Sequence, residues 1–153
     1  MTIPPSRRAV LAPLLAAALA ALTPLPVSAE DGGISSITQI GEANTTSIRQ
    51  KFIASGGLGD RQNTATVSQT GTANSMDITQ EGNTLTATVT QHGANNTGTI
   101  EQYGNGHSAD VQQTGDGHGI TIRQDNFLGA KASDPSAVIT GSGPGSTVVV
   151  RQF

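Results

Sequence analysis

Residues 85–102 read LTATVTQHGANNTGTIEQ and consist of two similar halves, each ending in a glutamine. In each half, one set of alternate positions holds aliphatic or small residues and the closing glutamine. The other set holds threonines and, near the end, Glu101. A period of two indicates a β-strand with one dry face and one wet face. Between the halves stands Gly93-Ala94-Asn95-Asn96, in which the Gly and the final Asn are expected to take the positive φ angles of a tight turn. The stretch therefore predicts strand, turn, strand.

The same pattern recurs along the chain, and over most of its length successive repeat glutamines are 11 positions apart. An Ile or Val stands two residues before each repeat glutamine, and a Gly stands two residues after most of them. We interpret the chain as five units of about 22 residues. The units are 33–50, 63–80, 85–102, 107–124 and 135–152, and the connections are 51–62, 81–84, 103–106 and 125–134. The fifth unit is degenerate, with Gly141 in the first Gln position and Ser146 in the Asn position.

Charged residues within the expected strands all fall in the set opposite the aliphatics and glutamines. A single strand-turn-strand unit cannot bury its apolar face, but units stacked at about 4.7–4.8 Å share a core. The sequence therefore predicts an all-β protein, a β-solenoid of five repeats that can stack further into cross-β fibrils. Inward Gln and Asn side chains are expected to form ladders along the stack, each amide bonding to its equivalent above and below.

The candidate functional residues follow from this pattern. The expected ladder and assembly residues are Gln39, Asn44, Gln50, Gln69, Asn74, Gln80, Gln91, Asn96, Gln102, Gln113, Gln124 and Gln152. The expected turn glycines are Gly41, Gly71, Gly93, Gly115 and Gly143. The expected core aliphatics are Ile37, Ile48, Val67, Ile78, Val89, Ile100, Val111, Ile122, Ile139 and Val150.

Composition excludes several classes of protein. The 153 residues include no Cys and no Trp, and aromatic residues make up 3%, too few for an ordinary packed core of this length. A disulfide framework and a Cys metal site are impossible. The formal net charge of −3, with scattered basic residues, is unlike that of a nucleic-acid-binding protein.

No catalytic motif is visible, so we expect neither enzymatic activity nor a cofactor. His92, His107 and His118 lack the spacing of a metal site. His107 and His118 are 11 residues apart and are expected to occupy equivalent positions on the two strands of one unit, His118 replacing the ladder Asn.

Residues 1–29 have a different composition. Arg7 and Arg8 precede the apolar run Val10–Leu22, and Val27-Ser28-Ala29 has the small-residue pattern of a signal-peptidase site. The run is shorter than the roughly 20 residues of a membrane span. We predict a cleaved signal peptide over 1–29, the general secretion route and a mature domain over 30–153.

The unit resembles the curlin repeat, x6-Gln-x-Gly-x-x-Asn-x5-Gln, of bacterial curli subunits. The resemblance is complete in the first three units and nearly so in the fourth, where His118 replaces Asn. It implies a secreted structural subunit of amyloid fibres on the surface of a Gram-negative bacterium, serving biofilm matrix, adhesion and aggregation. The implied partners are other copies of the chain, a related curlin subunit or nucleator, an outer-membrane export pore and a periplasmic chaperone.

The outermost units are the expected growth sites, because a stack of rungs has two open edges. The expected contacts are Ile37, Gln39, Asn44, Ile48 and Gln50 at one end and Val148, Val150 and Gln152 at the other. Asp77, Asp110, Gly98 and Gly119 are interpreted either as brakes on polymerisation of the inner units or as ordinary solvated surface. The main alternative function is a secreted, non-polymerising β-solenoid adhesin, with the long connections as caps or a binding face. Ice binding through outward Thr rows is disfavoured, because Asp110 and Gln112 interrupt the rows.

Overall fold

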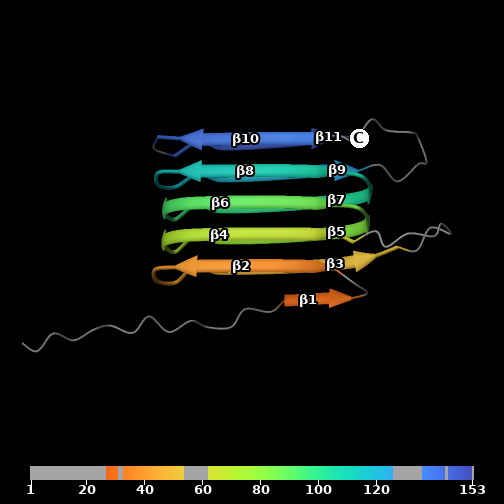
Figure 1. Ribbon diagram of the computed structural model, residues 1–153. Helices are drawn as coiled ribbons and strands as arrows, with labels where there is room; N and C mark the ends of the chain where they lie inside the picture. The colour runs from red at the N-terminus through yellow and green to blue at the C-terminus, as the bar shows by residue number, and fades with distance from the viewer. Residues whose placement is uncertain (1–26, 31–32, 54–61, 126–135, 144, 153) are drawn as a thin grey trace, which may run out of the picture.

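The computed structural model describes residues 27–30, 33–53, 62–125, 136–143 and 145–152 (Figure 1). These residues form eleven β-strands. The strands are β1 (Val27–Glu30), β2 (Ile34–Ile40), β3 (Thr45–Phe52), β4 (Thr64–Thr72), β5 (Ser75–Asn83), β6 (Thr86–Ala94), β7 (Thr97–Asn105), β8 (Ser108–Thr114), β9 (Gly119–Asp125), β10 (Ser136–Ser142) and β11 (Thr147–Gln152). The expected signal segment lies outside the described residues up to position 26, and so do most of the two long connections.

The strands form two parallel sheets whose orders skip alternate strands. Sheet A has the order β1-β3-β5-β7-β9-β11, and sheet B has the order β10-β8-β6-β4-β2. Each consecutive pair from β2–β3 to β10–β11 therefore forms one rung with a strand in each sheet, and we number these rungs 1 to 5. Figure 1 shows the five rungs stacked in chain order. The expected β-solenoid of strand-turn-strand repeats is confirmed.

The register aligns equivalent repeat positions in every neighbouring pair. Gln69 lies opposite Gln39 and Gln91, and Ile78 lies opposite Ile48 and Ile100. In this register, identical residues lie above one another in the parallel stack. The two-residue period alone fixes only which face each residue is on. Strand β1 adds one more partner to β3, with Val27 opposite Ile48. The expected cleavage point after Ala29 lies inside β1.

The core is a narrow layer between the sheets. Seven expected core aliphatics, at positions 48, 67, 78, 89, 100, 111 and 122, are at most 1% exposed. Ile139 is 8% exposed, whereas Ile37 and Val150 are only partly buried because they belong to the outermost rungs. Gly98 has an inward position, and a Cβ there would lie 2.4 Å from the sulfur of Met76. Gly98 thus makes room for a large neighbour, a role that the sequence did not reveal.

In the turns, positive φ angles occur at the repeat glycines but not at the repeat asparagines. Gly41 and Gly71 have φ angles of 111° and 122°. The second positive φ falls on the residue before the Asn, at Ala43 (54°) and Ala73 (57°). The expectation that the repeat Asn itself takes positive φ is wrong, because its side chain rather than its backbone is what the turn requires.

The glycines are also required for space. A Cβ on Gly71 would lie 2.0 Å from the carbonyl oxygen of Gly93 in the next rung, and a Cβ on Gly93 would lie 2.1 Å from that of Gly115. The glycine column thus brings successive turns into direct backbone contact. A side chain in this column would separate the rungs.

Candidate functional site

Two glutamine ladders run along the stack, one from each sheet. In sheet B the amide Nε2 of each Gln donates to Oε1 of the next, over 2.7, 2.7 and 2.6 Å, through Gln39, Gln69, Gln91 and Gln113. In sheet A the corresponding distances are 2.8, 2.8, 2.8 and 2.7 Å, through Gln50, Gln80, Gln102, Gln124 and Gln152. Buried amides are thereby paired along the stack, as the sequence pattern predicts.

In every ladder glutamine except Gln152, the second N–H of the amide joins the two sheets. Gln80 Nε2 donates to the Thr64 carbonyl oxygen at 3.1 Å, and Gln102 Nε2 donates to that of Thr86 at 3.0 Å. These carbonyls fix the orientation of the amides, because only the NH2 group can face them. Every ladder bond therefore runs the same way, from an N-terminal donor rung to a C-terminal acceptor rung.

This direction gives the sheet A ladder two different ends. In rung 1, Gln50 is 3% exposed, and its Oε1 accepts a hydrogen bond from the Ser35 hydroxyl at 2.9 Å but from no glutamine. In rung 5, the described structure shows no acceptor for the NH2 group of Gln152. One end of the stack thus presents an amide acceptor and the other an amide donor.

The sheet B ladder stops one rung earlier. Gly141 lies opposite Gln113 in the register and has no side chain to continue the ladder. Instead, a Cβ built on Gly141 would lie 3.6 Å from Nδ1 of His118, so the imidazole lies close to this position. The donor end of the stack is therefore complete in sheet A only.

The asparagines form a third ladder at the turn. Oδ1 of Asn44 accepts the backbone N–H of Asn74 at 3.0 Å, and Oδ1 of Asn74 accepts that of Asn96 at 3.1 Å. Nδ2 of Asn44 donates to the Gly71 carbonyl oxygen at 3.0 Å, and Asn74 makes the equivalent bond to Gly93 at 2.9 Å. Each Asn thus ties its turn to the next rung by two hydrogen bonds, one as acceptor and one as donor.

His118 continues this ladder with different chemistry. It is 1% exposed, and its backbone N–H donates to Asn96 Oδ1 at 3.0 Å. Its Nδ1 accepts the backbone N–H of Ser146 at 3.2 Å, as Asn Oδ1 does elsewhere, and its Nε2 lies 3.1 Å from the Thr114 carbonyl oxygen. His107 lies equally buried at the other end of the same rung, with Nε2 3.0 Å from the carbonyl oxygen of Tyr103. Both imidazoles thus occupy buried turn positions in the stack.

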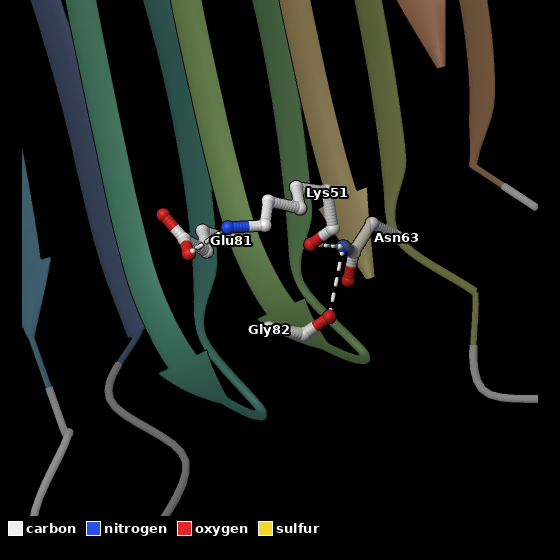
Figure 2. Close-up of polar contacts among 4 residues, drawn as sticks. All are labelled: Lys51, Asn63, Glu81 and Gly82. Carbon is white, nitrogen blue, oxygen red and sulfur yellow. Dashed lines mark hydrogen bonds and ion pairs between the residues drawn. The ribbon is translucent and has the colours of Figure 1, made fainter. Parts of the chain in front are cut away.

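Asn63 is a ladder residue that sequence reasoning missed. Figure 2 shows its Nδ2 donating to the carbonyl oxygens of Gly82 (3.0 Å) and Lys51 (3.5 Å). Its Oδ1 accepts the backbone N–H of Leu85 at 3.0 Å. These bonds match those of Asn44 but lie at the opposite corner of the solenoid. The long connection after rung 1 had hidden the equivalence, although Asn63 directly precedes a strand as Asn44 does.

Other kinds of site are not found in the described ranges. No group of three or more His, Asp or Glu side chains there could hold a metal ion. The part of the chain that the structure describes also contains no helix with the length and hydropathy needed to cross a membrane.

The comparisons with known proteins agree with the repeat geometry. The sequence model of the curlin-associated repeat matches residues 61–93 and 93–125. These two matches span β4 to β9, the three central rungs with the most regular ladders. No curated protein and no solved structure matches the chain significantly. The chain therefore contains curlin-associated repeats over residues 61–125, which supports the resemblance of its repeat unit to that of curlin-family proteins.

Proposed function

We propose that this chain is the structural subunit of an extracellular curli-type amyloid fibre, and that the fibre grows head to tail. The single observation that carries the proposal is the direction of the sheet A ladder. Gln152 ends it with an amide donor and Gln50 begins it with an amide acceptor, so two copies stacked in the same direction complete each other. Such a contact does not close on itself and extends into a fibre.

The strands at the two ends of the stack are suited to this contact. When rung 5 of one copy meets rung 1 of the next, β11 lies beside β3, with Val150 opposite Ile48 and Gln152 opposite Gln50. The placement of β1 supports this register, because Val27 of β1 lies opposite Ile48 on the same edge of β3. The β3 edge thus accepts a parallel strand with an aliphatic residue in that position.

The location and partners follow from the family. We propose that residues 1–29 direct export and are cleaved, and that the fibre serves biofilm matrix, adhesion and aggregation outside a Gram-negative cell. The fibre would contain copies of this chain and a related curlin subunit or nucleator. A periplasmic chaperone and an outer-membrane pore would act during export. The role is structural, without catalysis.

Purified residues 30–153 provide the test. We expect thioflavin T fluorescence to rise after a lag, and fibre diffraction to show reflections near ~4.7 and ~10 Å. A stable β-rich monomer that never polymerises would overturn the proposal and favour the alternative, a secreted adhesin.

Substitutions in the ladders test the head-to-tail contact separately. With wild-type seeds, Gln152→Ala and Gln39→Ala should slow elongation more than Gln91→Ala, because the first two residues lie in the outermost rungs. Gln152→Ala should have the larger effect of the two, since Gly141 leaves Gln39 without a side-chain partner at the junction. Equal rates for all three variants would contradict growth through the end rungs.

A further inference from the structure

The charges of the solenoid are concentrated on one face. On the outer surface of sheet A, one row of in-register positions holds Arg49, Thr79, Glu101, Arg123 and Arg151. We call it the arginine row. On the outer face of sheet B, the only ionisable residues among those described are His92 and Asp110. When two copies stack end to end, the charged side chains that come together are therefore mainly those of sheet A.

Two of the three arginines have acidic neighbours. Arg49 lies 3.9 Å from Asp77, and Arg123 lies 3.9 Å from Glu101 and 3.7 Å from Asp125. The Arg123 guanidinium also lies 5.8 Å from the centre of the Tyr103 ring.

Arg151 lacks such compensation. It lies directly opposite Arg123, and rung 5 contains no Asp or Glu among its described residues. In the described part of the chain, no carboxylate lies within ion-pair distance of its guanidinium. Like charges directly opposite each other on neighbouring strands are destabilising.

The head-to-tail junction adds a third arginine to this pair. In the register of the proposed fibre, Arg49 of the next copy lies opposite Arg151, on the side away from Arg123. Three successive positions of the row, about 4.7–4.9 Å apart, then carry arginines. The carboxylates nearest the outer two arginines already face those arginines, so the excess positive charge remains at Arg151.

We propose that the junction binds a multivalent phosphate anion, which neutralises the arginine row and promotes elongation. The guanidinium group suits this ligand, because it presents paired N–H donors that bind phosphate oxygens in a bidentate manner. A chain of linked phosphates bridges adjacent arginines, which chloride cannot do. The site is complete only when two copies meet, so the proposal rests on the head-to-tail fibre proposed above.

Seeded elongation tests the proposal, with inorganic tripolyphosphate as the probe. Wild-type seeds and wild-type monomer (residues 30–153) are compared in tripolyphosphate, orthophosphate and sodium chloride at equal ionic strength. We expect tripolyphosphate to raise the elongation rate by roughly two- to fivefold, the range that cross-strand charge pairs give. Orthophosphate and chloride should have smaller effects.

Arg151→Glu is the decisive variant. The new carboxylate lies between Arg123 and Arg49 of the next copy, so the variant should elongate faster than wild type without the anion and gain nothing from tripolyphosphate. Arg151→Gln removes one positive charge. Thr66→Glu changes the net charge equally on the exposed surface of sheet B, where its strand neighbours are uncharged. Thr66→Glu should retain the response to tripolyphosphate, whereas Arg151→Gln should lose most of it.

The outcomes separate the two proposals. Two results would overturn the anion site but not the fibre. In the first, wild-type fibres form equally fast in all three salts. In the second, tripolyphosphate accelerates Arg151→Glu as much as it accelerates wild type. A chain that forms no fibres with or without the anion would overturn both proposals. Sedimentation of fibres with phosphorus-31 detection gives a second readout. Wild-type fibres should retain tripolyphosphate, and Arg151→Glu fibres should not.

Discussion

The glycines after the repeat glutamines can be required for two reasons, a positive φ angle and a lack of space for a Cβ atom. Gly71 has a φ of 122°, and a Cβ on it would lie 2.0 Å from a backbone oxygen of the next rung. Gly143 has a φ of 98°, but nothing lies within 4 Å of a Cβ built on it. The first glycine is needed for conformation and space, and the second for conformation alone.

Alanine substitutions at these two glycines should therefore differ in cost. Gly143→Ala should lower the free energy of unfolding by about 1–2 kcal/mol, the usual cost of positive φ for a residue with a Cβ. Gly71→Ala should cost at least about 3 kcal/mol, because backbone atoms must also move apart. Guanidinium denaturation of both variants and wild type measures the difference. Equal costs would mean that the close approach of turns does not hold the rungs together.

The strands, their register and the glutamine ladders could all be predicted, because one physical signal repeats several times. An alternation of period two sets the face of each residue, and the 11-residue spacing sets which residues superpose. Position-specific facts could not be predicted in this way. Ala73 takes the positive φ because the following Asn is held by its side chain, and Gly98 is small because Met76 in the preceding rung is large. Such facts depend on neighbours 22 residues away.

The contact between rungs 4 and 5 differs from the rest of the Asn ladder. Asn96 Nδ2 donates to the Gly115 carbonyl oxygen at 2.8 Å, a bond between rungs. The structure shows no such bond from His118 to Gly143. The His118 Nε2 bonds within its own rung, to Thr114, and Nδ1 lies 2.8 Å from the hydroxyl and 3.2 Å from the backbone nitrogen of Ser146 in rung 5. The turn carbonyl of rung 5 is therefore not bonded by the ladder side chain, as the turn carbonyls of rungs 2 to 4 are.

His118→Asn should strengthen this contact. The new amide can donate to Gly143 while its oxygen still accepts the backbone N–H of Ser146. We expect a gain of about 1 kcal/mol, the net value of one hydrogen bond. Hydrogen exchange of the β10 and β11 amides measures it, with about fivefold slower exchange expected. His118→Ala is the control and should speed exchange, because it leaves the Ser146 N–H without its acceptor. Faster exchange in both variants would show that the volume of the imidazole beside Gly141, rather than its hydrogen bonds, holds rung 5.

At the scale of the whole molecule, the stack has one face with charges and another with mostly hydroxyl groups, and its amide ladders all point in one direction. A solenoid with two equivalent ends would have no preferred order of addition. Here the donor and acceptor ends differ, so addition of copies has a direction. The edge of β3 is where the next copy would add, and strand β1 of the N-terminal segment already pairs with that edge.

Residues 27–30 should therefore compete with an incoming copy for the edge of β3. A chain that begins at Val27 keeps β1, whereas a chain that begins at Glu30, as expected after signal cleavage, loses three of its four residues. We expect the longer chain to elongate about tenfold more slowly, the factor that about 1.4 kcal/mol of lost edge pairing gives. The longer chain with Ser28→Pro is the matched control, since the N–H at position 28 faces β3 in this register and proline has no N–H to donate. Its rate should return to that of the shorter chain. If all three chains elongate equally from the same seeds, β1 does not compete with an incoming copy for the edge of β3. Removal of residues 27–29 then leaves the rate of fibre growth unchanged.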